Sequence, residues 1–365
     1  MSPSRTLRRA LALVVALAAV AVGCGSDDTS EPAASSTTAA AAAGATTAAP
    51  TTASIPKGLT LTIADQSGAV AIPWNLAKAG DGTPYSVKFA DFNGGAAVIE
   101  ALRSGAADVA YVGEAPVPIA VDSGVTDLVG IAAAANPGSS GNYYLVVQPG
   151  SPARSVADLR GKKIAYPPGT GRQMILASIL KANGLSLTDG VQGVQLAGAE
   201  VAPTFAAGAV DAAIVLGNQY FKLGEPPIIA DGKGHNYGMS LLITTRKVLQ
   251  DEGKVAAIGD FVRRAVKAEN HKAAHPDDYI DADYVAKQGL THAQGRRLVD
   301  EAGLDHYYPI DDALIGAFQS VADGLQSSGV VKSKVDAGAY VDGRFNDLVN
   351  DQNAADGVTL KPLAA

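Results

Sequence analysis

The stretch ADFNGGAAVIEALRSGAADVAYVGEAPVPIA (residues 90–120) contains the repeating unit from which the fold can be read. Two glycines precede residues 96–103, whose apolar positions have helical spacing, and a further glycine follows them. Residues 108–112 (DVAYV) predict a strand, and Pro116 suits the first turn of another helix. Strands that alternate with helices in this way indicate a parallel α/β sheet.

The same alternation extends on both sides of this stretch. Further strands are expected at 59–65, 85–91, 128–133, 163–166, 191–196 and 212–216, and further helices at 155–160, 171–183 and 202–207. The segment EALRSGAADVAYVG (100–113) has the same order of helix, glycine, aspartate and strand as APTFAAGAVDAAIVLG (202–217). Two lobes of related topology would explain this similarity, and so would a generic helix–turn–strand unit.

Two segments flanked by Gly and Pro, 142–147 and 237–244, are expected to cross between the lobes as a hinge. The predicted division is therefore a discontinuous lobe 1 (58–146 and 238–365) and an inserted lobe 2 (147–237). The chain from residue 247 onward is expected to be mostly helical and to pack on lobe 1.

The N-terminus has the features of a bacterial export signal. Three arginines precede an apolar run at 10–22, which is shorter than a membrane-spanning helix, and Cys24 follows it. We expect cleavage after residue 23 and lipidation of Cys24, although an ordinary secretory signal with an incidental cysteine is the alternative. Residues 24–57 are rich in Ala, Thr, Ser and Pro, which predicts a disordered linker. The mature protein would then be lipid-anchored on the extracytoplasmic face of the cell membrane.

Composition and motifs restrict the function. The net charge is −7, which argues against a nucleic-acid partner, and one cysteine allows no intramolecular disulfide. His271 and His275 have metal-ligand spacing, but Pro276 ends their helix and no HExxH motif is present, so no metal is expected. The sequence has no GxSxG motif and no complete phosphate-binding loop, and we expect neither a cofactor nor an enzyme.

Two segments resemble the periplasmic substrate-binding proteins of ABC importers. They are residues 90–120, quoted above, and PGSPARSVADLRGKKIAYPPGTGRQMILASILKANGLSL (149–187). The branch concerned takes up aliphatic sulfonates, taurine and nitrate. The resemblance implies a bilobal type II periplasmic-binding-protein fold, with two α/β lobes joined by a two-strand hinge. It also implies a monomer that captures a small anionic organic solute, closes around it and delivers it to ABC permease subunits in the membrane.

The residues themselves point to a site for such a solute. An anion held between two lobes needs donors, and the unpaired amides at helix N-termini supply them. Three turns precede predicted helices and carry candidate ligand-binding residues: Gly94 and Gly95, Glu114 and Ala115, and Thr170, Gly171 and Arg172. Thr170 is expected to cap its helix, and Arg172 to clamp oxyanion oxygens. Ordinary turn chemistry and a solvated arginine are the alternatives.

The remaining candidate ligand-binding residues are Gln66, Gly68, Trp74, Asn142, Tyr143, Asn218 and Tyr237. Trp74 would stack on an organic solute or, alternatively, pack within its own lobe. A carboxylate at Glu114 is unfavourable beside a simple anion, so we hypothesise a solute with an oxyanion end and a donor end. An aliphatic sulfonate or a taurine-like compound fits best, and nitrate or an aromatic carboxylate is possible. An enzyme or a ligand-sensing lipoprotein on the same fold stays open.

Overall fold

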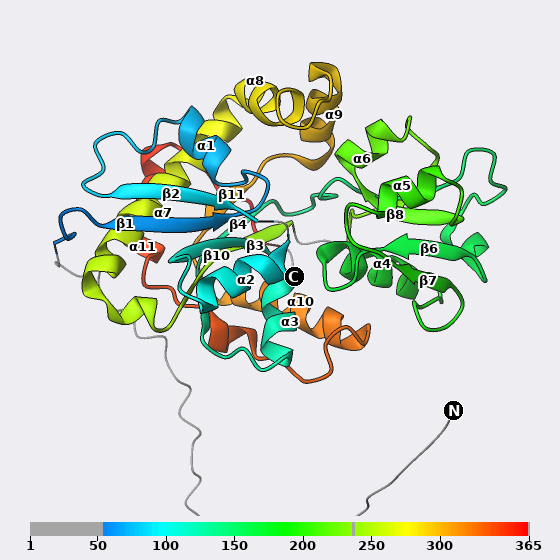
Figure 1. The fold of residues 1–365 in the computed structure, drawn as a ribbon, viewed down its shortest axis with the longest axis horizontal. Coiled ribbons are helices and arrows are strands. Elements are labelled where there is room, and N and C mark those ends of the chain that lie inside the picture. Colours follow the sequence, from blue (N-terminus) through cyan, green and yellow to red (C-terminus); the bar gives the residue numbers. More distant parts are fainter. Residues whose placement is uncertain (1–53, 93, 236–237, 364–365) are drawn as a thin grey trace, which may run out of the picture. The chain divides into compact units, whose positions relative to one another are not determined.

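Two separate β-sheets organise the chain (Figure 1). The computed structural model describes residues 54–92, 94–235 and 238–363. The first sheet has the order β11-β4-β10-β3-β1-β2. Its strands are β1 (Thr60–Asp65), β2 (Ser86–Asp91), β3 (Val109–Gly113), β4 (Leu128–Ala135), β10 (Met239–Thr245) and β11 (His306–Tyr308). The second sheet has the order β7-β6-β8-β5-β9. Its strands are β5 (Tyr143–Val147), β6 (Lys163–Tyr166), β7 (Gln192–Gln195), β8 (Ala212–Leu216) and β9 (Ile228–Asp231).

Helices cover both sheets. Those that lie next to strands of the first sheet in the chain are α1 (Ala71–Leu76), α2 (Gly95–Arg103), α3 (Pro116–Asp122), α7 (Glu252–Ala274), α8 (Pro276–Tyr279), α9 (His292–Ala302), α10 (Asp312–Ser327) and α11 (Asn346–Ala355). Of these, α9 buries Leu298 in the apolar cluster of the second sheet. Those of the second sheet are α4 (Gly171–Ala182), α5 (Val201–Ala206) and α6 (Gly217–Lys222). Short 3-10 turns occur at Val156–Leu159, Val248–Gln250 and Ala337–Tyr340, and a π-helical turn at Ile280–Val285. We call the two groups of elements lobe 1 and lobe 2.

The central strands of the first sheet are buried on both faces, and most of their residues are apolar. Every residue of β4 (LVGIAAAA) is buried, as expected for a strand with helices on both sides. Leu61 and Ile63 of β1 point into the cluster formed with α7, whereas Ala64 points into the cluster that contains α2 and α10. Alternation along the strand therefore divides the core of lobe 1 into two layers.

Each sheet contains one strand that connects to the other lobe and is antiparallel to its neighbours. β10 is antiparallel to β3 and β4, so the chain returns from lobe 2 into the middle of the first sheet. β5 is antiparallel to β8 and β9 and carries the chain outward. Each crossing segment thus ends in a buried strand, which anchors the hinge at both ends.

Lobe 1 contacts lobe 2 through two of its helices. On α9, Leu298 packs against Gly217, and Glu301 accepts a hydrogen bond from the Tyr144 hydroxyl over 2.6 Å. On α10, the Ser327 hydroxyl accepts a hydrogen bond from Lys181 of α4 over 3.2 Å. No helix within the described ranges is long and apolar enough to cross a membrane.

Candidate functional site

The N-terminus of α4 lies directly beside the side chain of Tyr143. A Cβ atom added to Gly171 would come within 3.1 Å of the Tyr143 hydroxyl oxygen. Glycine at position 171 therefore lets this hydroxyl approach the first turn of α4, where backbone amides have no helical partner. The tyrosine is placed by β5, which it begins, and by the hydrogen bond that its carbonyl accepts from the Gly232 amide.

Three charged side chains act electrostatically on Tyr143. Burial, together with the carboxylates of Glu114 and Asp305, raises the pKa of Tyr143 to about 12, while the guanidinium of Arg172 acts to lower it. All three charges therefore act on one hydroxyl, although they come from the end of β3, from the segment before β11 and from α4. This juxtaposition defines the candidate site.

Arg172 is the cation of the candidate site. Its side chain is only 9% exposed, and burial lowers its pKa. Among the described residues, its hydrogen-bond acceptors are neutral, namely Oε1 of Gln219 at 3.1 Å and the carbonyl of Gly198 at 3.3 Å. A buried charge that is held by neutral acceptors is a favourable place for an oxyanion, which would complete its pairing.

Glu114 contacts the first residue of β10, the strand by which the chain returns from lobe 2. The residue is 5% exposed, and its Oε2 accepts a hydrogen bond from the backbone amide of Met239 over 3.2 Å. Ala115, which is buried, is the N-cap of α3. A Cβ atom at Gly95 would come within 2.5 Å of the ring of Pro116, so the N-termini of α2 and α3 are packed together. Gly94 has a φ of 96°, which favours glycine at the start of α2.

Two asparagines add buried acceptors on lobe 2. The side-chain oxygens of Asn142 and Asn218 are buried and have no hydrogen-bond partner among the described residues. A Cβ atom at Gly217 would lie 3.2 Å from the Cβ of Asn142, which places the start of α6 against the hinge. Unpaired buried acceptors are costly, and a bound molecule with N–H or O–H groups would satisfy them.

Two candidates lie in the turn after β1 and serve the fold there. The Gln66 amide donates to the carbonyl of Tyr111 over 2.8 Å. Gly68 has a φ of 74° and lies against Ile72 and Lys287. The buried carboxylate of Asp65 organises the turn by accepting from the amides of Gln66, Val70 and Ala71.

Two expectations about individual side chains are wrong. Trp74 is 4% exposed and stacks on Phe261 of α7 with ring centroids 5.0 Å apart, so it packs inside lobe 1 and is not available to a solute. Thr170 does not cap α4, because its hydroxyl donates to the carbonyl of Pro167 over 2.8 Å. Tyr237 and Cys24 lie outside the described residues.

Sequence reasoning missed Asp305, which the structure brings to the site, and it placed Gln219 only among the weaker polar candidates that follow the strand at 212–216. Gln219 is one of several polar residues that follow β8, yet it holds the guanidinium of Arg172. Asp305 lies between α9 and β11 in a segment expected to be helical, and no motif distinguishes it. A glutamine three residues into a helix that begins at a strand end is the one available signal for Gln219.

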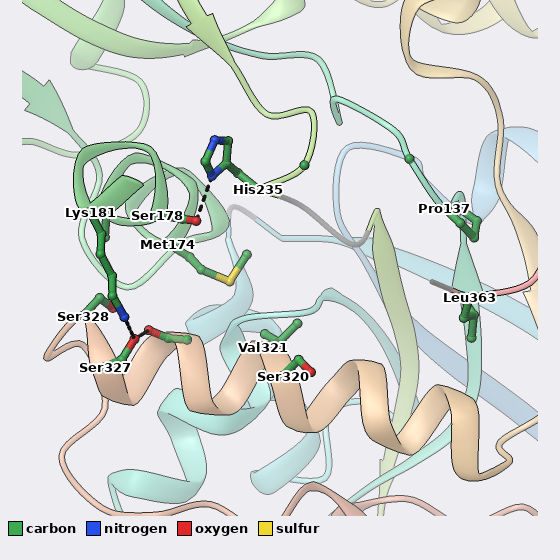
Figure 2. Close-up of a pocket in the computed structure, with 14 residues that line it drawn as sticks. Pro137, Met174, Ser178, Lys181, His235, Ser320, Val321, Ser327, Ser328 and Leu363 are labelled. Atoms are coloured by element: carbon green, nitrogen blue, oxygen red, sulfur yellow. Dashed lines mark hydrogen bonds between the residues drawn. The ribbon is translucent and has the colours of Figure 1, made fainter. Parts of the chain in front are cut away.

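A cavity of about 420 Å³ lies between α4 and α10, and none of Tyr143, Gly171 and Arg172 lines it (Figure 2). It is bounded by α4, by α10 and by the hinge residues Pro137 and His235. His235 shares a hydrogen bond of 2.9 Å with Ser178 of α4. Within the described ranges, no three His, Cys, Asp or Glu side chains are placed to hold a metal ion. His271 and His275 instead stack on each other.

The fold and this inter-lobe arrangement define a class of protein. Residues 77–232 match the family described as "ABC transporter, phosphonate, periplasmic substrate-binding protein", so this part of the chain is similar to the periplasmic substrate-binding proteins of ABC transporters. The fold is that of the aliphatic sulphonate binding protein SsuA from Escherichia coli, with a TM-score of 0.67 at 23% identity over 77% of this chain and 91% of that one. The SsuA from Xanthomonas axonopodis bound to MOPS gives a TM-score of 0.68 at 23% identity, covering 78% and 99%.

Curated relatives have related names. A "Putative aliphatic sulfonates-binding protein" from Escherichia coli is 28% identical over 46% of this chain, and the match spans 52% of that protein, about half its length. A "Putative binding protein" from Brucella abortus is 29% identical over 68% of this chain and 78% of its own. The predicted resemblance to these substrate-binding proteins and the bilobal α/β fold are thereby confirmed.

Proposed function

We propose that this protein is the extracytoplasmic solute-binding component of an ABC importer and that it captures a small organic anion between its two lobes. The site joins groups from both lobes, which suits a protein that closes around its ligand. The family match over residues 77–232 and the names of the relatives support transport rather than catalysis. A bound solute would favour the closed form, because it contacts both lobes only in that form, and the permease would receive it from there.

The observation that carries this proposal is the environment of Arg172. Arg172 is only 9% exposed and lies in the first turn of α4. Among the described residues, its guanidinium has only neutral hydrogen-bond acceptors. Sulfonate oxygens could accept from the guanidinium, from the Tyr143 hydroxyl and from the first amides of α4. The three donors come from one lobe, so the anion would bind there before closure.

The hydrogen-bond acceptors of the site restrict the chemical class of the solute. Glu114 is buried close to Tyr143, and the side-chain oxygens of Asn142 and Asn218 have no hydrogen-bond partner in the part of the chain that the structure describes. These oxygens favour a solute that also carries N–H or O–H groups. A taurine-like aminosulfonate meets both requirements, and the aliphatic sulfonates named for the relatives share the same head group.

The N-terminal features complete the proposal. Cleavage before Cys24 and lipidation of its thiol would tether the protein to the outer face of the cell membrane, with residues 25–57 as a spacer. A monomer of this kind would act with permease subunits in that membrane and with no nucleic acid. The predicted division into lobe 1 (58–146 and 238–365) and lobe 2 (147–237) stays a prediction, but β5 (Tyr143–Val147) pairs with β8 and β9, so the second sheet begins at Tyr143.

Calorimetric titration tests the ligand class. The wild-type protein, Arg172→Gln and the matched control Arg160→Gln, which changes an exposed arginine of the same lobe, are each titrated with taurine, ethanesulfonate, nitrate and benzoate. We expect taurine to bind best to wild type. Loss of one charged hydrogen-bonding partner costs about 2–4 kcal/mol, so Arg172→Gln should bind ~30-fold or more weakly, whereas Arg160→Gln should match wild type. If nitrate binds most tightly, the hypothesis of a solute with an oxyanion end and a donor end is wrong. If no sulfonate binds, the sulfonate assignment is wrong.

A further inference from the structure

Helix α9 lies among the elements of lobe 1 in the chain, but it packs an apolar side chain on lobe 2. Leu298 is 1% exposed and lies in the apolar cluster of the second sheet, together with Leu290, which precedes the helix. A Cβ atom added to Gly217, the first residue of α6, would collide with the Leu298 side chain. Glycine at position 217 therefore allows α9 to press against the start of α6.

A charged network joins the same helix to lobe 2. The Arg297 guanidinium contacts Glu301 of its own helix at 2.7 Å and Glu225 of lobe 2 at 2.7 Å. It also lies 5.7 and 5.4 Å from the ring centroids of Tyr220 and Phe221 of α6, where aromatic faces attract a cation. Arg297 thus connects the lobes through an ion pair and through two rings.

Two contacts of α9 adjoin candidate ligand-binding residues in the chain. The Tyr144 hydroxyl donates to Glu301 over 2.6 Å, and Tyr143 precedes Tyr144 on β5. Gly217, which α9 touches, precedes Asn218 on α6. Burial acts to raise the pKa of Glu301, but hydrogen bonds from Tyr144 and from the arginine outweigh burial and lower the pKa. Glu301 is therefore ionised at neutral pH, and α9 holds segments that carry the candidate site.

The contacts of α9 occur in an arrangement in which the lobes are close together at the candidate site. Glu114 and Asp305 of lobe 1 act electrostatically on Tyr143 of lobe 2. If the lobes moved apart at α9, Leu298 would be exposed and the ion pair of Arg297 with lobe 2 would break. Both changes cost free energy, so these contacts favour the arrangement in which the lobes are together.

We propose that α9 is a clamp that stabilises the closed form of the protein, with Leu298 as its apolar contact and Arg297 as its polar contact. The ligand-free protein is mostly open and gains these contacts when it closes, so the clamp raises the affinity for solute without touching it. Arg297 is thus a positioning residue. This inference rests on the lobe closure of the proposed function, and not on the chemical class of the solute.

Two neighbouring arginines of α9 allow a matched test. Arg297 pairs with Glu225 of lobe 2, whereas Arg296 pairs with Asp277 of α8. Arg297→Gln and Arg296→Gln therefore make the same change at adjacent positions, and only the first breaks an ion pair with lobe 2. Glu225→Gln removes the partner of Arg297, and Arg297→Lys keeps its charge.

The variants are titrated calorimetrically with taurine. Arg297→Gln and Glu225→Gln should each weaken binding about three- to tenfold, and the double variant should bind no more weakly than Arg297→Gln alone. Arg297→Lys should restore part of the affinity, and Arg296→Gln should bind within twofold of wild type. Without solute, Arg297→Gln should unfold in urea like wild type, because the clamp is open in that form. Equal weakening by Arg296→Gln, or tighter binding by Arg297→Gln, would overturn the clamp.

A disulfide tests the clamp without a solute. Gly217→Cys and Leu298→Cys, combined with Cys24→Ser to remove the native thiol, change two positions that touch, so the two new thiols are within reach of each other. Oxidation should lower the radius of gyration measured by small-angle X-ray scattering, because it holds the lobes closed, and reduction should restore the wild-type value.

The possible failures are distinct. An unchanged radius of gyration after oxidation, or no disulfide in the folded protein, would overturn the clamp and leave the proposed function intact. If taurine does not bind but oxidation makes the protein more compact, the clamp stands and the proposed solute is wrong.

Discussion

Trp74 stacks on Phe261 with an interplanar angle of 28° and ring centroids 5.0 Å apart, and Phe89 meets the same indole at its edge. These three rings join α1, α7 and β2 inside lobe 1. The only tryptophan of the chain is therefore a core residue. Trp74→Ala should lower the free energy of unfolding by about 3–5 kcal/mol, measured by urea denaturation, because it leaves a large cavity.

The same variant separates a core role from a binding role. At a temperature where Trp74→Ala is folded, its affinity for the best solute should lie within twofold of wild type. A large loss of affinity without a loss of stability would return Trp74 to the solute site.

Gln219 supplies a second prediction, because it holds Nη1 of Arg172 with a neutral oxygen at 3.1 Å. Gln219→Glu places a carboxylate at that position, which would neutralise the guanidinium and repel an incoming oxyanion. We expect at least a tenfold loss of affinity for sulfonates by calorimetry. Gln192→Glu adds the same charge at an exposed position of lobe 2 and should leave affinity unchanged. Equal effects of both changes would show that net charge, and not Arg172, controls binding.

Much of this fold was accessible from local sequence pattern. The strand at Val109–Gly113 and the helix at Gly95–Arg103 follow from apolar periodicity and from glycines at their ends. The strand β11 was missed because three residues (HYY) carry no periodicity, and its place is set by pairing with β4. Short elements of this kind depend on tertiary contacts that a sequence does not display.

The site was accessible only in part. Helix starts at Gly171 and Pro116 could be read from glycine and proline positions, because those residues have a backbone preference of their own. The role of Asp305 could not be predicted from sequence, because it depends on the proximity of Asp305 to Tyr143 in the folded protein. Thr170 has the side chain of a helix cap, but a nearby carbonyl at Pro167 competes for its hydroxyl.

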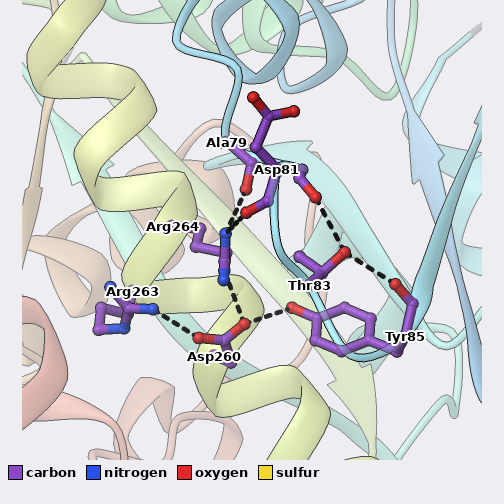
Figure 3. A network of polar contacts seen from close by, with 8 residues as sticks. Ala79, Asp81, Thr83, Tyr85, Asp260, Arg263 and Arg264 are labelled. Carbon is purple, nitrogen blue, oxygen red and sulfur yellow. Dashed lines mark hydrogen bonds and ion pairs between the residues drawn. The ribbon is translucent and has the colours of Figure 1, made fainter. Parts of the chain in front are cut away.

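A polar network around Asp260 of α7 predicts a pH dependence of stability (Figure 3). Asp260 accepts hydrogen bonds from Arg263, Arg264 and the hydroxyl of Tyr85, and Arg264 also donates to the carbonyls of Ala79 and Asp81. Burial acts to raise the pKa of Asp260, but its arginine partners outweigh burial and lower the pKa below the usual value.

The sign of the effect follows from that lowered pKa. The stabilising contribution of Asp260 is present above pH ~4, the ordinary aspartate value, and is lost as the pH falls through the lower folded value. Asp260→Asn should therefore cost about 1–2 kcal/mol at pH 7 and progressively less below pH 4, measured by urea denaturation. Asp189→Asn, at an exposed position, serves as the control. A cost of Asp260→Asn that stays constant from pH 7 to pH 3 would contradict the prediction.

The proposed lipid anchor can be tested in a bacterial host that processes lipoproteins. Cys24→Ser should move the protein from the membrane fraction to the soluble fraction and should prevent labelling with a radioactive fatty acid. Solute affinity should not change, because the site lies in the folded lobes. Membrane association that survives Cys24→Ser would refute lipidation at this residue.

The position of β10 has a consequence for how the chain acquires its structure. β10 lies between β3 and β4 in the first sheet, although the whole second sheet separates it from both in the chain. While the polypeptide is being synthesised or translocated from its N-terminus, the edges of β3 and β4 that pair with β10 stay unpaired until β10 has emerged. Folding that depends on such distant pairing is slow, and open edges invite aggregation. A fragment that stops before β10 should therefore be prone to aggregate and should depend on chaperones to stay in solution.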